Sequence, residues 1–183
     1  MNYHLDWLIE KYENNERLKY VFFWGHQPSK DGSLKETCFS QWWLSAFEVD
    51  TIIYQTAEHW MMAQKARLFN DKETLKKILI ANTPAEAKKL GREVRNFDPV
   101  IWDENKYAYV KEGNIYKFSQ HPDLKEYLLN TGDRILVEAS PVDRIWGIGM
   151  AKDNPDIENP RKWKGENLLG FALMEARDVL GKE

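Results

Sequence analysis

The stretch YQTAEHWMMAQKARLF, residues 54–69, decides the fold, because its composition is that of one helix buried on most of its sides. Its apolar residues leave no wide polar face. They are Ala57, Trp60, Met61, Met62, Ala63, Ala66, Leu68 and Phe69. Thr56 is suited to cap the start of this helix through its side-chain oxygen. We therefore expect the rest of the chain to pack around residues 54–69.

Two charged residues within this apolar helix are the first functional clue. Burying an ionisable group costs several kcal/mol unless it is paired or hydrogen-bonded. Glu58 and Lys65 are two helical turns apart, so they share a face, with roughly 10 Å of axial rise between them. That spacing leaves room for a small molecule between a carboxylate and an amine. The alternative is a structural ion pair, or charged side chains that reach solvent at the helix ends.

The bulk composition is that of a globular protein rich in aromatic residues, which either fill the core or line a pocket for planar rings. The chain has 183 residues, of which 43% are hydrophobic and 30% charged, and this length suits one domain. The net charge of −3 argues against a broad basic surface for nucleic acid, although it leaves room for a local phosphate site. The single cysteine, Cys38, excludes an intramolecular disulfide, and we expect it to be a small buried residue. No apolar run is long enough to span a membrane, so we expect a cytoplasmic protein.

Periodicity and turn signals predict an α+β fold that is predominantly helical, with a small sheet of short strands. The expected helices cover residues 4–19, 54–69, 71–81, 84–94, 100–120, 123–130 and 167–180. The expected strands cover residues 20–24, 49–54 and 134–139, and residues 38–47 fit either a strand or a loop. We expect a single domain over residues 1–183, with residues 1–19 as an N-terminal helical extension.

Two features of the middle of the chain are candidates for binding. Arg92 and Arg95 offer planar guanidinium groups that suit phosphate, although a solvated helix end explains them equally well. Trp102 lies just inside a predicted helix start, where it either stacks on a ring or belongs to the core. The histidines are scattered without the spacing of metal ligands, so we expect no metal site.

Further candidates lie near the last predicted strand and the last predicted helix. Glu138 ends the strand, Asp143 follows within a few residues, and Trp146 and Gly147 belong to a tight turn over residues 146–149. Carboxylates at strand ends are common catalytic positions, although both could instead be turn caps. Asn167 opens the final helix, where it either caps the helix or shapes a loop against a ligand.

Several segments together resemble a known family. In chain order, they are YQTAEHWMMAQKA, KKLGR, the isolated Trp102, LVEASPVDRIWGIG and WKGENLLGFALMEARD. This series resembles the YbiA-like proteins, the NADAR superfamily, over about residues 20–180. The resemblance implies a YbiA-like domain with N-glycosidase activity and no cofactor. Some members cleave the ribosylamino bond of early riboflavin-pathway intermediates, and others remove ADP-ribose from guanine in nucleic acid.

The resemblance also implies roles for individual residues. The glutamate of the AEH motif, Glu58, matches the catalytic glutamate of the family, and Trp102 and Asp143 match its catalytic tryptophan and aspartate. Lys65 matches the motif lysine, which in the ADP-ribose-removing branch forms a covalent adduct with the sugar. We expect Arg92 to hold phosphate, and the remaining substrate-binding candidates are Glu138, Trp146, Gly147 and Asn167.

The resemblance favours one substrate over another. The bacterial pyrimidine-cleaving members have VEHT where this chain has VEAS, so Ala139 replaces a polar residue. They also have a short glycine-rich segment in place of residues 150–163. We therefore expect removal of ADP-ribose from a modified guanine, with ribosylamino-pyrimidine phosphate as the alternative substrate. The expected partner is a ribosylated or ADP-ribosylated base, free or at a single-stranded nucleic-acid end, and no membrane. A module that binds ADP-ribose or a nucleotide without cleaving it is the alternative of a different class.

Overall fold

The computed structural model describes residues 1–182, which form two compact units. One unit contains residues 41–121, and the other contains residues 1–40 and 122–182. The elements are α1 (Leu5–Glu13), β1 (Tyr20–Phe23), the 3₁₀-helix η1 (Glu36–Phe39), β2 (Phe47–Val49), β3 (Ile52–Tyr54), α2 (Ala57–Leu68), α3 (Lys72–Leu79), α4 (Pro84–Arg92), α5 (Pro99–Gln120), α6 (Pro122–Leu129), β4 (Ile135–Glu138), the 3₁₀-helix η2 (Pro160–Lys162) and α7 (Leu168–Leu180). The prediction of a mainly helical α+β fold is confirmed.

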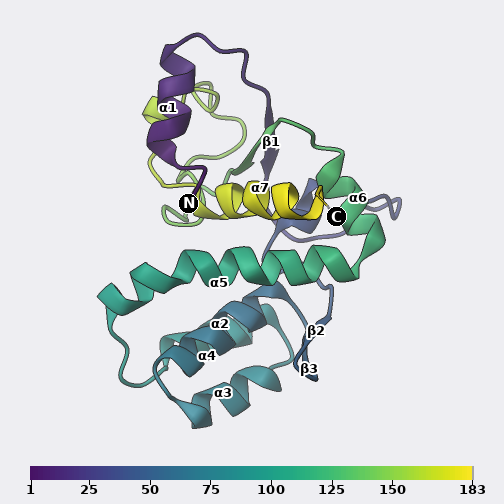
Figure 1. Cartoon of the computed structure of the whole chain (residues 1–183), viewed down its shortest axis with the longest axis vertical. Helices are drawn as coiled ribbons and strands as arrows, with labels where there is room; N and C mark the ends of the chain where they lie inside the picture. Colours follow the sequence, from purple (N-terminus) through teal and green to yellow (C-terminus); the bar gives the residue numbers. More distant parts are fainter. Residues whose placement is uncertain (183) are drawn as a thin grey trace. The chain divides into compact units, whose positions relative to one another are not determined.

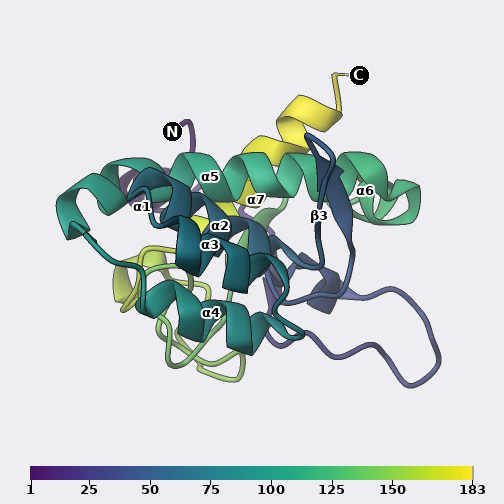
Figure 2. The same ribbon diagram turned by 90° about the horizontal axis from the view of Figure 1, so that it is seen from below.

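Helix α2 is the centre of the unit formed by residues 41–121. It packs against α3, α4 and α5, and Figures 1 and 2 show these three helices around it. Every residue from Ala57 to Ala63 is buried, as is Ala66. Thr56 caps the helix, because its side-chain oxygen accepts a hydrogen bond from the backbone N–H of His59. The prediction of a helix buried on most of its sides is therefore confirmed.

Two glycines allow the neighbouring helices to approach α2 closely. A Cβ atom at Gly91 of α4 would collide with the side chain of Met62, and one at Gly113 of α5 would collide with the ring of Trp60. The indole N–H of Trp60 donates to the Tyr109 carbonyl at 2.8 Å and so ties α2 to α5. These contacts fix the position of the C-terminal end of α4 and the course of α5 along α2.

The segment before α2 is a β-hairpin, which corrects the expected strand over residues 49–54. Strands β2 and β3 pair antiparallel, with Phe47 opposite Tyr54. Asp50 and Thr51 form the turn with φ of 50° and 65°, as a two-residue hairpin loop requires. The Gln120 side chain both accepts from and donates to the backbone of Glu48, and thereby anchors the hairpin to the end of α5.

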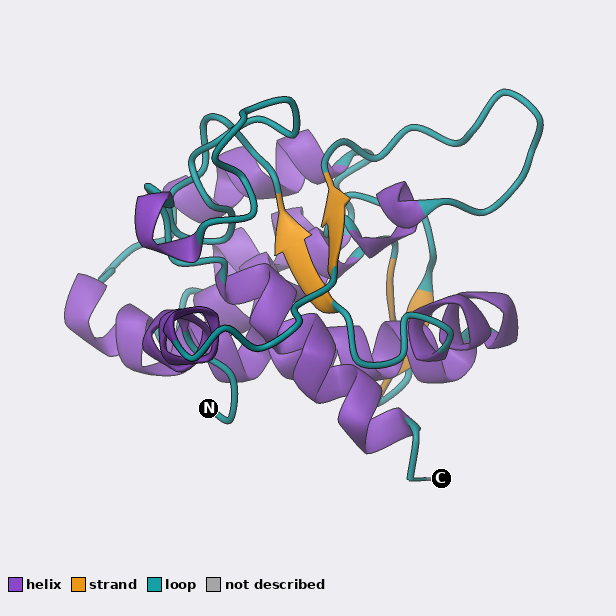
Figure 3. Ribbon diagram, turned by 90° about the horizontal axis from the view of Figure 1, so that it is seen from above, coloured by secondary structure: helices purple, strands orange, loops and turns teal. Residues whose placement is uncertain are grey.

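The other unit contains a parallel pair of strands. Tyr20 of β1 pairs with Ile135 of β4, and Phe23 pairs with Glu138; Figure 3 shows the two strands pointing the same way. Helix α7 packs against β4, and all of its residues from Leu168 to Arg177 are buried. Within residues 1–182, the predicted small sheet is therefore present as two separate two-stranded sheets.

Other boundaries differ from the expected ones. The first helix ends at Glu13 rather than near residue 19, because Asn15 adopts φ of 56° and the chain leaves the helix. Residues 36–39, which overlap the segment of open assignment, form η1, and Cys38 is buried within it. Glu183, the last residue of the predicted domain, lies outside the described residues, and the single domain stays a prediction. Within residues 1–182, no helix is both long and apolar enough to cross a membrane.

Candidate active site

The start of α2 is held by a buried histidine. The His59 Nε2–H donates to the Ala81 carbonyl at 3.1 Å, because a carbonyl can only accept. In the neutral ring Nδ1 is then the acceptor for the Thr56 hydroxyl at 2.8 Å. Burial lowers the pKa of the His59 imidazole, consistent with this neutral tautomer. His59 therefore orients the first turn of α2, where Glu58 lies.

The Glu58 side chain is buried, with only 2% of the residue exposed. Its backbone N–H donates to the Gln41 carbonyl at 3.0 Å. A carboxylate in the first turn of a helix is favoured by the helix dipole. In surroundings that exclude water, such a charge acts strongly on any positive charge that develops near it.

Lys65 lies on the same helix against two aromatic rings. Its Nζ is 4.1 Å from the ring centroid of Phe97 and 5.6 Å from that of Trp102. Burial lowers the pKa of the Lys65 amine, and the positive charge of Arg92 lowers it further. A lysine in these surroundings carries a larger fraction of neutral amine than one in solvent. It can act either as a nucleophile or as a cation held on aromatic faces.

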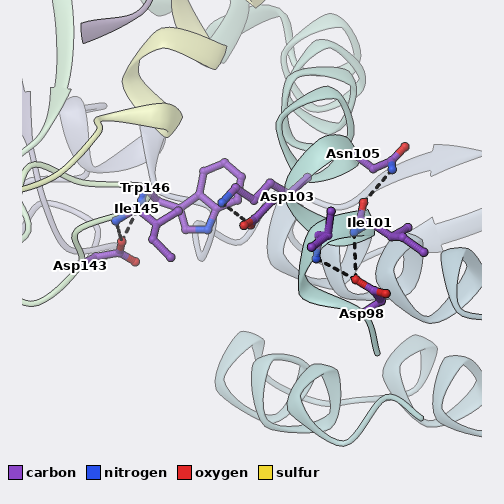
Figure 4. Close-up of polar contacts among 9 residues, drawn as sticks. Asp98, Ile101, Asp103, Asn105, Asp143, Ile145 and Trp146 are labelled. Atoms are coloured by element: carbon purple, nitrogen blue, oxygen red, sulfur yellow. Dashed lines mark hydrogen bonds and ion pairs between the residues drawn. The ribbon is translucent and has the colours of Figure 1, made fainter. Parts of the chain in front are cut away.

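The N-terminus of α5 positions Trp102. The Asp98 carboxylate accepts from the backbone N–H of Val100 at 2.8 Å and of Ile101 at 3.2 Å, and Pro99 occupies the first helical position (Figure 4). Trp102 follows in the first turn and is only partly exposed. Its ring stacks on Tyr109 with a centroid distance of 6.3 Å. Trp102 thus has an ordered place beside Lys65.

The two arginine candidates have different surroundings. Arg92 ends α4, is exposed, and lies close enough to Lys65 to lower the pKa of its amine. The Arg95 guanidinium instead donates to Asp71 at 2.7 Å, and the Arg95 backbone N–H donates to the same carboxylate at 2.9 Å. Asp71 also caps α3 through Thr74. Arg95 therefore has a structural partner, whereas Arg92 stays a candidate for phosphate.

The unit with β4 carries a second set of candidates, beginning with Asp143. Its Oδ1 accepts from the backbone N–H groups of Ile145 and Trp146, each at 2.8 Å (Figure 4). The Asp143 backbone N–H donates to the Ser140 hydroxyl at 3.1 Å, and its carbonyl accepts from Gly149 at 2.9 Å. The carboxylate is thus the cap of a turn, as one interpretation of the sequence expected, and its position is tightly fixed.

Asn167 links this turn to the end of β4. Its Oδ1 accepts from the Glu138 backbone N–H at 3.0 Å, and its Nδ2 donates to the Leu136 carbonyl at 2.9 Å. Asn167 is completely buried and has φ of 56°. It contributes no side-chain hydrogen bond as the cap of α7, so its structural role is to hold the strand end.

Gly147 and Gly165 allow two loops to lie against each other. A Cβ atom at Gly147 would be 2.8 Å from the Glu138 carbonyl oxygen, and one at Gly165 would collide with the Gly147 carbonyl. The Trp146 carbonyl accepts from the backbone N–H of Leu169 at 3.1 Å. The turn, the end of β4 and the start of α7 are therefore joined mainly through backbone groups.

The predicted site residues thus fall into two groups, one in each unit. The α2 group consists of Glu58, Lys65, Arg92 and Trp102; Lys65 lies beside Trp102, and the positive charge of Arg92 lowers the pKa of the Lys65 amine. The turn group consists of Glu138, Asp143, Trp146, Gly147 and Asn167, which the turn and the end of β4 bring together.

Sequence reasoning missed several residues near these candidates. Phe97, which lies under the Lys65 amine, is in a connection without periodicity that could have revealed it. Gln41 and Asn114 form a buried side-chain hydrogen bond at 3.0 Å, and Lys117 is completely buried in α5. A polar residue on an otherwise apolar helix face is the signal that could have pointed to Asn114 and Lys117. Among residues 1–182, no three histidine, cysteine, aspartate or glutamate side chains are grouped as metal ligands.

Comparison with known proteins assigns the family. The model of the NADAR domain matches residues 22–181, so the chain belongs to the NADAR family. A protein named an N-glycosidase from Acanthamoeba polyphaga mimivirus is 46% identical over 168 residues, covering 89% of this chain and 97% of its own length. An N-glycosidase from Nostoc punctiforme is 36% identical over 143 residues, covering 78% of this chain and 85% of its own length.

A solved structure and a plant relative extend the comparison. The NMR structure of the Escherichia coli protein YbiA superposes with a TM-score of 0.70 at 27% identity, covering 90% of this chain and 86% of that chain. A riboflavin biosynthesis protein from Zea mays chloroplasts is 31% identical over 140 residues, covering 72% of this chain and 21% of its own length. The chain is accordingly an enzyme of the N-glycosidase class, a hydrolase of N-glycosyl bonds.

Proposed function

We propose that this enzyme hydrolyses the ribosyl N-glycosidic bond of an ADP-ribosylated guanine and releases ADP-ribose. The observation that supports this substrate is the Lys65 amine, which lies beside two aromatic rings and whose pKa is lowered by the charge of the exposed Arg92. A cation next to aromatic faces suits a substrate that combines rings with a diphosphate. The resemblance of residues 150–163 to the longer members of the family supports the same substrate.

We place the Glu58 carboxylate next to the reacting carbon, C1′ of the sugar. Breaking the C1′–N bond leaves the electron pair with the base and positive charge on the sugar, which a buried carboxylate stabilises. Glu58 also accepts a proton from the water that attacks C1′, and Asp143 protonates the departing base. Trp102 stacks on the sugar or base, and Arg92 holds phosphate. Glu138, Trp146, Gly147 and Asn167 shape the substrate-binding surface in their unit.

Lys65 has two alternative roles in this reaction. As a neutral amine it attacks C1′ of the opened sugar and loses water to form a Schiff base, which a later water molecule hydrolyses. As an ammonium it binds phosphate or orients a carboxylate. The lowered pKa of the amine favours the first role, and the two aromatic rings favour the second.

Borohydride reduction during turnover separates the two roles of Lys65. If the Schiff base forms, mass spectrometry will find the reduced sugar on the peptide that contains Lys65 in the wild type and not in Lys65→Ala. Lack of a trapped adduct in the wild type, together with loss of activity in Lys65→Ala, would assign the electrostatic role instead. Lys111→Ala, on α5 of the same unit, is the matched control for the loss of one lysine.

A second candidate substrate is a ribosylamino-pyrimidine phosphate. It is favoured by the similarity to the riboflavin biosynthesis protein from maize. The deciding experiment offers three substrates side by side, with release of the base followed by mass spectrometry. They are an oligonucleotide bearing ADP-ribosyl-guanine, the same modified base as a free nucleotide, and the ribosylamino-pyrimidine phosphate. Preferred cleavage of the pyrimidine compound would overturn the ADP-ribose assignment, and preference between the first two would show whether nucleic acid is the acceptor.

A further inference from the structure

A pair of buried side-chain amides lies next to the start of α2. Gln41 and Asn114 are 7% and 0% exposed. The Asn114 Nδ2 donates to the Val110 carbonyl at 2.8 Å and to the Gln41 Oε1 at 3.0 Å. The Gln41 backbone carbonyl accepts the N–H of Glu58 at 3.0 Å. The pair is thus joined directly to the residue that carries the candidate catalytic carboxylate.

The orientation of both amides follows from one carbonyl group. The Val110 oxygen can only accept, so it must face the nitrogen of Asn114 and not its oxygen. The second hydrogen of that nitrogen is used by Gln41, whose oxygen must therefore face Asn114. The Asn114 Oδ1 and the Gln41 Nε2 consequently point elsewhere, and neither has a hydrogen-bond partner within residues 1–182.

A buried donor and a buried acceptor without partners destabilise the fold, and native proteins rarely retain them without a use. One neutral group that both accepts and donates would satisfy the two atoms. Phosphate does not fit, because the Asn114 oxygen would repel it. A hydroxyl group fits, because it can accept from the Gln41 amide while it donates to the Asn114 oxygen.

We propose that Gln41 and Asn114 bind the ribose hydroxyl adjacent to the bond that is cleaved, the 2′-hydroxyl, and so select ribosides over 2′-deoxyribosides. The inference rests on the proposed position of Glu58 at C1′, because the 2′-hydroxyl is on the neighbouring carbon. It holds for both candidate substrates, since each carries a ribose on the scissile bond. Gln41 and Asn114 are specificity residues in this scheme, and neither exchanges a proton with the reacting atoms.

The test removes the Gln41 amide from the protein and the 2′-hydroxyl from the substrate, separately and together. Turnover of the ADP-ribosyl-guanine oligonucleotide and of the ribosylamino-pyrimidine phosphate is measured for wild type and Gln41→Met, each with the 2′-hydroxyl present or absent. 2′-Deoxyribosides are chemically more labile, but this lability affects wild type and variant equally and cancels when their ribo-to-deoxy ratios are compared. The ratio of kcat/KM for the ribo over the deoxy substrate should fall at least about tenfold in Gln41→Met. An unchanged ratio would overturn the proposal, as would a change in base preference instead.

Further measurements test the proposal without a variant that could misfold, and separate its failure from a failure of the role proposed for Glu58. In wild-type protein with ¹⁵N-labelled side-chain amides, ribose 5-phosphate should shift the Gln41 amide resonance, and 2-deoxyribose 5-phosphate should leave it nearly unchanged. Equal shifts, or none, would overturn the proposal without any variant. Gln120→Met removes a glutamine that anchors the hairpin and should leave the ratio unchanged. If Glu58→Gln retained wild-type turnover, the proposed role of Glu58 would fail, whichever ratio Gln41→Met gave.

Discussion

The two groups of candidate residues differ in what holds them in place. The members of the α2 group stand on helices, and two of them are in contact through their side chains, the Lys65 amine and the Trp102 ring. The turn group stands on loops, and its members meet through backbone groups, as Asp143 does with Ile145 and Trp146. The less buried side chains of the α2 group, Lys65 and Arg92, can therefore change with little effect on the fold, whereas a change in the turn group disrupts the hydrogen bonds that hold its loops in place.

This difference affects what a substitution in each group is expected to change. The α2 group contains a buried carboxylate and an amine whose pKa is lowered, which are features of residues that take part in reactions. In the turn group, the Asp143 carboxylate and the Asn167 amide both bind backbone groups. We expect substitutions in the α2 group to act mainly on the rate, and those in the turn group to act on stability as well.

The largest effect should come from Glu58→Gln. This change keeps the size of a side chain that is 2% exposed but removes its charge, so kcat should fall by about a thousandfold. Rates are followed by mass spectrometry of the released base, with circular dichroism to show that the fold is kept. Glu104→Gln makes the same chemical change at an exposed position of α5 and should retain full activity. A rate near that of the wild type in Glu58→Gln would remove the α2 group from the chemistry.

Asn167→Ala should have the next largest effect, on stability. It leaves the Glu138 N–H and the Leu136 carbonyl without their partner and places alanine at φ of 56°, at a cost of about 3 kcal/mol in the free energy of unfolding. Urea unfolding measures this cost, and Asn167→Gly should recover about 1 kcal/mol because glycine tolerates that φ.

Asn70→Ala isolates the backbone contribution to this result. Asn70 has φ of 54° but is exposed, so its substitution should cost only about 1 kcal/mol. If Asn167→Ala proved no more costly than Asn70→Ala, the hydrogen bonds of Asn167 would not support the turn group, and the contrast between the two groups would fail.

The α2 group could be predicted further from the sequence than the turn group. The apolar run of residues 54–69 and the cap at Thr56 are local signals, and the structure contains the buried helix that they predict. The contact between Lys65 and Phe97 depends on how α2 and the start of α5 pack, which no local pattern encodes. The family resemblance, rather than periodicity, was needed to single out Trp102.

The turn group illustrates what local patterns cannot give. Asn167 was expected to cap the last helix or shape a loop, but its side chain binds backbone groups of Leu136 and Glu138, which are far away in the sequence. The hairpin before α2 was missed for a different reason. Its turn residues, Asp50 and Thr51, both have positive φ without a glycine to signal the turn.

Arg92→Leu should have a smaller effect, on the pH dependence of the rate. The positive charge of Arg92 adds to burial in lowering the pKa of Lys65, so its removal should raise that pKa. If Lys65 acts as an amine, the limb of the kcat profile that rises with pH will move to higher pH, and kcat at pH 7 will fall. If Lys65 acts as an ammonium, only the falling alkaline limb will move, and kcat at pH 7 will be kept.

The kcat profile is the appropriate measurement for this variant, because loss of a phosphate contact would change KM at every pH. Lys89→Leu removes a positive charge from an exposed position of α4 and serves as the matched control. If the Arg92→Leu profile coincided with that of the wild type, the charge of Arg92 would not influence the pKa of Lys65. Arg92 would then have no electrostatic connection to the rest of the α2 group.

The smallest effect should come from Asp71→Asn, which asks whether the α2 group also depends on its scaffold. Hydrogen bonds from the Arg95 side chain and backbone, together with those from Thr74, hold the pKa of the Asp71 carboxyl well below its usual range. A carboxyl whose pKa is lowered on folding stabilises the protein above its unfolded pKa of about 4, and that stability is lost as the pH falls further. The variant should therefore have a Tm a few degrees lower at pH 7, and the difference from the wild type should shrink between pH 4 and pH 2.

Scanning calorimetry from pH 2 to pH 7 measures Tm, and kcat is measured at pH 7. Since Arg95 anchors the connection that carries Phe97, a loss of kcat larger than the loss of folded protein would show that the α2 group, like the turn group, is positioned by its scaffold.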